Sequence, residues 1–84
     1  MKTITHVLKD PSGLHARIAS TITAEANRWK SNVTIVTRGV RSNATDMMGL
    51  MLLDVREGER IEIVVEGEDE DRAAKAFEGL VIGL

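Results

Sequence analysis

The sequence predicts an α+β fold in which helices cover one face of an antiparallel sheet. Short β-branched runs alternate along the chain with longer segments whose apolar residues recur every three or four positions. Clusters of turn residues separate these segments at short intervals, as hairpin-type connections require. The resulting order, β-α-β-β-α-β-α, is typical of an open-faced sandwich.

The first strand is expected at residues 3–8, which are rich in β-branched side chains and end at the turn residues 9–13. Strict alternation places His6 on the same face as Ile4 and Leu8. We therefore expect His6 to be a partly buried sheet residue rather than a ligand.

The first helix is predicted from Ala16 to about Trp29, with His15 at its N-cap or beside it. Its apolar stripe consists of Ala19, Ile22, Ala26 and Trp29. Strands follow at 33–37 and 40–43, joined by a two-residue turn at Arg38 and Gly39.

Residues 43–46 contain good helix N-cap residues, and residues 47–53 after them are apolar on almost every side. Their length favours a short helix that either packs between two surfaces or stays partly exposed for a partner. A last strand is predicted at 60–66, and a last helix follows from residue 68, where four acidic residues suit the helix dipole. The buried stripe of this helix would be Ala73, Phe77, Leu80 and Leu84, with an Asp71–Lys75 pair on its surface.

The composition predicts one small domain over residues 1–84, with 43% hydrophobic and 29% charged residues. A net charge of −2 gives no support for a nucleic-acid partner. The absence of cysteine excludes disulfides and thiolate metal sites, and no metal site is expected. No apolar run approaches the ~20 residues of a membrane span, so we expect a cytoplasmic protein without membrane insertion.

A candidate anion site lies at the start of the first helix, where His15 follows a Pro/Gly turn and Arg17 comes two residues later. The free backbone N–H groups at a helix N-terminus favour an anion, and an arginine adds a planar cation. Here these would be the N–H groups of Ala16, Arg17 and Ile18. A neutral imidazole is nucleophilic near pH 7, so a phosphoryl group on His15 would lie in this site.

Two motifs carry a resemblance to a known family: Gly13-Leu14-His15-Ala16-Arg17, and farther on Met48-Gly49-Leu50-Met51. Over nearly its whole length the chain resembles HPr, the histidine-containing phosphocarrier of the bacterial sugar phosphotransferase system. This resemblance implies a four-stranded antiparallel sheet with three helices. It also implies that the loop histidine accepts phosphate on Nδ1 from Enzyme I and passes it to the A domains of Enzyme II proteins.

Carried over by position, His15 is the phosphoacceptor and Arg17 its phosphoryl partner. The docking surface for partners would include Met47, Met48, Met51 and Leu52. The resemblance implies a monomeric carrier that needs no cofactor and has a phosphohistidine intermediate, rather than an independent turnover enzyme.

The chain departs from the family pattern at three positions. Ile18 replaces a proline, Asp46 replaces a serine that is a regulatory kinase site in many bacteria, and Asp54 replaces a common glycine. Asp46 would either imitate the phosphorylated serine or simply cap the helix. If Asp46 imitates the phosphorylated serine, an alternative function follows: a regulatory module that docks on a transcriptional regulator or a metabolic enzyme. An independent enzyme with His15 as base or metal ligand lacks companion carboxylates and cysteines in the sequence pattern.

Overall fold

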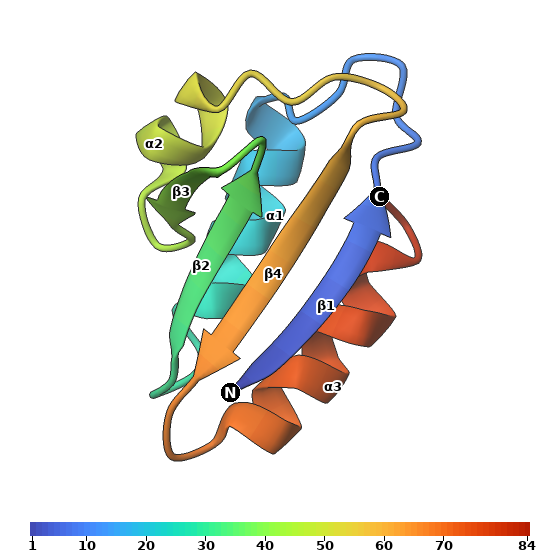
Figure 1. The fold of residues 1–84 in the computed structure, drawn as a ribbon. Coiled ribbons are helices and arrows are strands. Elements are labelled where there is room, and N and C mark those ends of the chain that lie inside the picture. Colours follow the sequence, from blue (N-terminus) through green and yellow to red (C-terminus); the bar gives the residue numbers. More distant parts are fainter.

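The computed structural model describes residues 1–84 and confirms the predicted order and class of the fold (Figure 1). The elements are β1 (Lys2–Val7), α1 (Ala16–Ala26), β2 (Asn32–Thr37), β3 (Val40–Asn43), α2 (Met47–Leu52), β4 (Arg60–Glu66) and α3 (Glu70–Val81). None of the helices has the length and apolar character needed to cross a bilayer.

The four strands form one antiparallel sheet in the order β1-β4-β2-β3. At the centre of the sheet, Ile63 of β4 lies opposite Ile4 of β1 on one side and Ile35 of β2 on the other. In Figure 1, α1 and α3 lie behind the sheet, and α2 lies at the β3 edge. The alternation of apolar residues in β2 and β4 is what directs one face of the sheet toward these helices.

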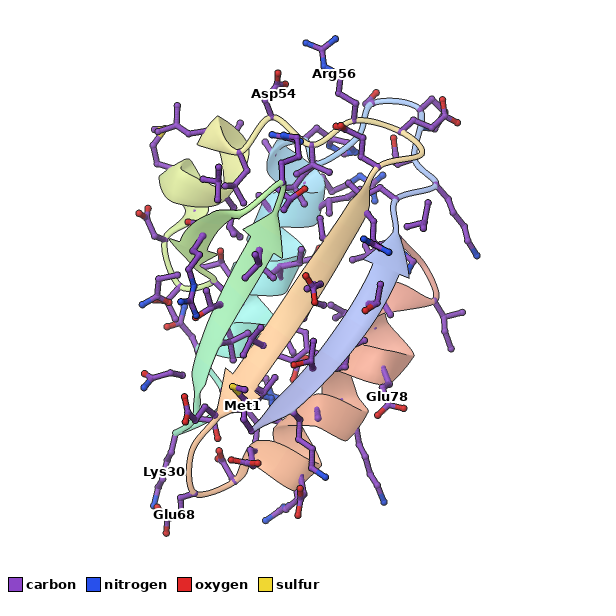
Figure 2. The ribbon with its side chains drawn as sticks, viewed as in Figure 1. Met1, Lys30, Asp54, Arg56, Glu68 and Glu78 are labelled. Atoms are coloured by element: carbon purple, nitrogen blue, oxygen red, sulfur yellow. The ribbon has the colours of Figure 1, made fainter.

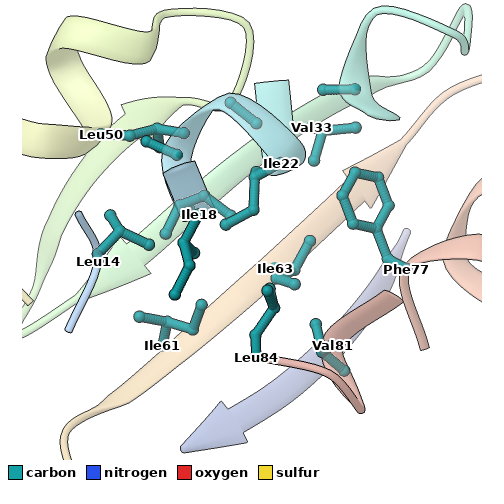
Figure 3. Close-up of a cluster of buried hydrophobic side chains, with 14 of the residues drawn as sticks. Leu14, Ile18, Ile22, Val33, Leu50, Ile61, Ile63, Phe77, Val81 and Leu84 are labelled. Carbon is teal, nitrogen blue, oxygen red and sulfur yellow. The ribbon is translucent and has the colours of Figure 1, made fainter. Parts of the chain in front are cut away.

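The core lies between the sheet and the helices and contains 19 buried hydrophobic residues. Figure 3 shows Ile18 and Ile22 of α1 above the sheet, close to Ile61 and Ile63 of β4, with Phe77 of α3 beside them. Burying a side chain of this size contributes about 1.5–3 kcal/mol, so this cluster fixes the N-terminal turn of α1 against β4.

Two helix boundaries differ from the sequence prediction. Helix α1 ends at Ala26 with Asn27 as its C-cap, because the N–H groups of Arg28 and Trp29 bond three residues back instead of four. Trp29 still packs against the core from the following turn, and its Nε1 donates to Glu25 at 2.8 Å. Helix α3 begins at Glu70 rather than at residue 68.

The surface of α3 also differs from the prediction in its ion pair. Asp71 pairs with Lys2 of β1 at 3.3 Å, and not with Lys75. Helix α3 packs beside β1, so a lysine from the strand reaches the first turn of the helix. Leu84 is buried as expected, but it follows the end of the helix, and its carbonyl accepts from the Lys9 N–H at 3.1 Å.

Candidate functional site

The loop before α1 is a hydrogen-bonded turn built around Asp10. The Asp10 carbonyl accepts from the Gly13 N–H at 2.9 Å, and its Oδ1 accepts from the Ser12 N–H at 2.8 Å. Gly13 has φ +66°, and a Cβ there would lie 2.2 Å from the carbonyl oxygen of Val55. Only glycine fits this position. The neighbouring Leu14 N–H bonds the same Val55 oxygen at 2.8 Å, which fixes the loop to the chain before β4.

His15 occupies the N-cap of α1, as the sequence predicts. Its backbone is extended (φ −86°, ψ 178°), and its side chain makes no capping bond. The N–H groups of Ala16, Arg17 and Ile18 have no acceptor in the protein. The start of α1 therefore presents three free donors beside the imidazole, together with the positive end of the helix dipole.

Asp10 is the residue of this site that the sequence analysis missed. One of its oxygens, Oδ2, lies 3.3 Å from His15 Nε2 and 3.3 Å from Arg17 Nη2. The Ser12 N–H, followed by the His15 side chain, lowers the pKa of Asp10 below its ordinary value. A turn-forming Asp-Pro-Ser-Gly segment so close to His15 is the sequence signal that could have indicated it.

The His15 loop and α2 line one hollow of about 420 Å³. Its walls are formed by Pro11, Ser12, Leu14, His15, Met51, Asp54, Val55 and Arg56. The fold thus joins the two sequence motifs, which are far apart along the chain. A second hollow, beside Arg38 at the β2–β3 turn, has neither His15 nor a residue of α2 in its lining.

Helix α2 has one buried residue, Leu50, which packs in the core. Leu50 is fully buried, whereas the predicted docking residues Met48 and Leu52 are 67% and 77% exposed. We call the set Met47, Met48, Met51 and Leu52 the α2 face. All four are exposed large hydrophobic residues, and Met51 also belongs to the hollow that His15 lines.

Asp46 serves as the N-cap of α2, where its Oδ1 accepts from the Gly49 N–H at 3.0 Å. A Cβ at Gly49 would lie 2.7 Å from Asp46 Oδ2, so the small residue makes room for this cap. The neighbouring hydroxyls of Ser42 and Thr45 both bond Asn43. This geometry favours the capping interpretation of Asp46.

The other two departures from the family pattern have different surroundings. Ile18 is buried in the core, so its side chain adds packing where a proline would have fixed the first turn. Asp54 has φ +50°, the left-handed region that glycine adopts most readily, and its carboxylate pairs with Arg56 at 3.2 Å. Figure 2 shows the side chains of Asp54 and Arg56 projecting away from the body of the protein.

His6 lies half-buried near the end of β1 and is not among the residues that line the hollow beside His15. Its Nε2 is buried without a hydrogen-bond partner, and burial, followed by the charge of Lys9, lowers the pKa of His6. No group of three or more His, Cys, Asp or Glu side chains is arranged to hold a metal ion. The histidine that stands among free donors is His15.

A family model described as the PTS HPr component phosphorylation site matches residues 2–82. The chain belongs to the HPr family. It is 42% identical over 82 residues to phosphocarrier protein HPr of Mycoplasma pneumoniae, covering 96% of this chain and 93% of that protein. It is also 41% identical over 70 residues to the HPr-like protein Crh of Halalkalibacterium halodurans, covering 83% of each chain.

The fold matches solved HPr structures as well. The structure of a Mycoplasma histidine-containing phosphocarrier protein superposes with a TM-score of 0.92 at 32% identity, covering 98% of this chain and 93% of that one. HPr membership therefore agrees with the fold and with the histidine at the start of α1.

Proposed function

We propose that the protein is a phosphocarrier in which His15 accepts a phosphoryl group from Enzyme I and passes it to Enzyme II A domains. The observation that carries this proposal is the position of the His15 imidazole beside three free backbone N–H groups and the Arg17 guanidinium. Membership in the HPr family supports it.

The site suits a phosphoryl group electrostatically. A phosphorylated side chain carries about −1.5 to −2 charges and three strong acceptor oxygens, which the N–H groups of Ala16, Arg17 and Ile18 can bind. The Arg17 side chain is 74% exposed and has one ion pair in the protein, so it is free to turn toward the phosphoryl group. Exposed ion pairs contribute only about 0–1 kcal/mol, so a dianion outcompetes the present partner.

The product of this reaction has to be stable and still reachable by the next acceptor. His15 is 29% exposed and lines an open hollow, and the α2 face borders that hollow through Met51. The flexible thioethers of Met47, Met48 and Met51 can adapt to more than one partner surface. A carrier must bind both a donor and an acceptor through the same site, and this face provides the contact area.

Incubation with phosphoenolpyruvate and a cognate Enzyme I tests the proposal. We expect one acid-labile phosphoryl group per chain by mass spectrometry, a phosphohistidine signal in the 31P spectrum, and no label in His15→Ala. Adding an Enzyme II A domain should then remove the label. A label that persists in His15→Ala, or no label with any cognate Enzyme I, would refute the phosphocarrier function.

A regulatory docking role is the second candidate function, and the similarity of the chain to an HPr-like protein Crh supports it. The capping bond of Asp46 to Gly49 counts against it, because the cap alone accounts for the aspartate. Asp46→Ser retains an N-cap oxygen and removes the charge. If Enzyme I loading and binding to a transcriptional regulator are both the same in Asp46→Ser, the negative charge at residue 46 has no regulatory function.

A further inference from the structure

We propose that Asp10 is the positioning residue that selects the tautomer of His15, keeping the proton on Nε2 and leaving the Nδ1 lone pair for the phosphoryl group. The inference deepens the proposed function and rests on it for the phosphoryl-transfer step. Asp10 would then determine which of the two ring nitrogens of His15 accepts the phosphoryl group.

The tautomer follows from the hydrogen-bonding capacity of the two groups. An ionised carboxylate can only accept, and a neutral imidazole has one donor and one acceptor nitrogen. Asp10 Oδ2 lies 3.3 Å from His15 Nε2, so Nε2 must be the donor. The side-chain hydrogen bond of His15 goes through Nε2 alone, so the other nitrogen, Nδ1, keeps its lone pair.

Asp10 can hold the ring in place because its own position is fixed. Its Oδ1 is occupied by the Ser12 N–H at 2.8 Å, and its carbonyl is occupied by the Gly13 N–H at 2.9 Å. The side chain is only 21% exposed. The Ser12 N–H and the His15 side chain lower the pKa of Asp10, which keeps it ionised and an acceptor at neutral pH.

The same contact assists the chemical step. The Nδ1 lone pair attacks phosphorus, the Nδ1–P bond forms, and the bond to the phosphoryl donor breaks with its electron pair leaving on the donor. The ring then carries phosphorus on Nδ1 and a proton on Nε2, and is a cation beside the Asp10 carboxylate. We expect the 3.3 Å contact to shorten, since charge-assisted bonds lie near 2.7–2.9 Å. In the onward transfer the Nδ1–P electron pair returns to Nδ1, and the proton stays on Nε2.

Arg17 and His15 share Asp10 Oδ2 but differ in how firmly they are held. Arg17 reaches this oxygen from a long side chain that is 74% exposed, whereas the shorter His15 side chain is only 29% exposed. When the phosphoryl group arrives, we expect Arg17 to turn to it and His15 to keep the carboxylate. Asp10 thus releases the Arg17 guanidinium to the phosphoryl group and keeps the hydrogen bond that it accepts from His15 Nε2–H, which fixes the ring.

The first test measures the tautomer in the unphosphorylated protein. The chain is labelled with 15N-histidine, and the Nδ1 and Nε2 shifts of His15 are recorded at a pH where the ring is neutral. We expect the Nε2–H form to predominate, and its ratio to the Nδ1–H form to fall about threefold to tenfold in Asp10→Asn, because a bond to a charged group is lost. Asp10→Asn keeps an oxygen for the Ser12 N–H, so the Ser12 and Gly13 amide signals report whether the turn survives.

Asp54→Asn is the matched control. It also removes one carboxylate charge, here from a residue that lines the hollow beside His15, but the Asp54 carboxylate pairs with Arg56 and not with His15. We expect the wild-type tautomer ratio in this variant. An Asp10→Asn ratio equal to that of Asp54→Asn overturns the proposal.

The second test examines the phosphorylated nitrogen after treatment with phosphoenolpyruvate and Enzyme I. The 31P spectrum should show phosphorus on Nδ1 alone in the wild-type protein and in Asp54→Asn, and a detectable share on Nε2 in Asp10→Asn. Phosphorylation of Nδ1 alone and at the wild-type rate in Asp10→Asn would overturn the role of Asp10, with the proposed function intact. Absence of wild-type phosphorylation would instead refute the proposed function, while the tautomer measurement still decides what Asp10 does.

Discussion

Two aspartates at opposite ends of the molecule show how one residue type serves two purposes. Asp69, before α3, accepts from the N–H groups of Lys30 and Ser31 at 3.0 and 2.9 Å and from the Ser31 hydroxyl. Asp10 accepts from one N–H group and from two side chains at 3.3 Å. In Figure 2, the label of Lys30 marks the end of the molecule that holds Asp69, and the label of Arg56 marks the end that holds the His15 loop.

The difference lies in the donors. Asp69 is bound mainly by backbone groups that cannot leave, and it ties the start of β2 to the start of α3. Asp10 binds two side chains at longer distances, and one of them, Arg17, is largely exposed. A carboxylate whose donors are backbone groups stabilises a fold, and one whose donors are mobile side chains can exchange them during a reaction.

The largest expected effect concerns two glycines, one at each end. A Cβ at Gly13 would lie 2.2 Å from the Val55 oxygen, and a Cβ at Gly67 would lie 2.7 Å from Ser31 Cα, both at positive φ. We expect Gly13→Ala and Gly67→Ala each to lose about 2–4 kcal/mol of unfolding free energy in urea. Where both are folded, only Gly13→Ala should slow phosphorylation by Enzyme I.

Gly79→Ala is the control for these glycines, because nothing lies within 4 Å of a Cβ at this helical position. It should be neutral or gain about 0.5–1 kcal/mol, since alanine is the better helix former. If Gly67→Ala slowed phosphorylation as much as Gly13→Ala, the two ends would not have separate functions.

The next effect concerns two exposed apolar residues, Leu52 on α2 and Ile82 after α3, which are 77% and 76% exposed. Leu52→Glu should raise about tenfold the KM of Enzyme I for this protein as its substrate. This corresponds to about 1.4 kcal/mol of lost docking energy. Ile82→Glu should leave the KM unchanged. Both should alter unfolding free energy by less than about 0.5 kcal/mol. Equal KM values for the two variants would remove the α2 face from the docking surface.

Ser31→Ala tests the end of the molecule that holds Asp69, without changing the His15 loop. Ser31 is buried, and its hydroxyl donates to Asp69, so we expect a loss of about 1 kcal/mol in urea unfolding. The phosphorylation rate should match that of the wild-type protein, because no residue of the His15 loop contacts Ser31 in the hydrogen-bond network. A slower rate at equal folded fraction would contradict this separation.

Acid should affect both aspartates with the same sign. Hydrogen bonds lower the pKa of Asp69 and of Asp10 below the unfolded value of 3.8, so the unfolded chain binds more protons below that pH. The stabilisation is present above pH 3.8 and is lost as the pH falls below it. Urea unfolding between pH 5 and 2.5 should show a flatter profile in Asp69→Asn than in the wild-type protein. An unchanged profile would mean that Asp69 is equally easy to protonate in both states.

The smallest effect concerns His6. Burial, and then the charge of Lys9, lowers its pKa below the unfolded value of 6.5, so the folded state favours the neutral ring. Stability should therefore be highest above pH 6.5 and should decline slightly as the pH falls below it. Thermal unfolding at pH 7.5 and 5.5 should show this decline in the wild-type protein and a smaller one in His6→Gln. The opposite sign would mean that His6 gains a partner when protonated.

The sequence by itself determined the order of the elements and the place of the histidine, because both depend on short stretches of chain. Alternating apolar residues specify the strand at residues 60–66, and a turn before a helical stripe puts His15 at a helix start. The resemblance to HPr supplied the four residues of the α2 face, whereas the apolar run after Asp46 left open whether the helix would be packed or exposed. That Leu50 is the one buried residue of α2 is a packing result.

The tertiary structure decided which groups the charged side chains contact. Asp71 meets Lys2 instead of Lys75, Asp69 binds the start of β2, and Asp10 reaches His15 and Arg17. Each contact depends on where distant backbone comes to lie, or on the shape of a turn held by other segments. Periodicity specifies which face of an element is apolar, whereas the partner of a carboxylate is set by the packing of elements against one another.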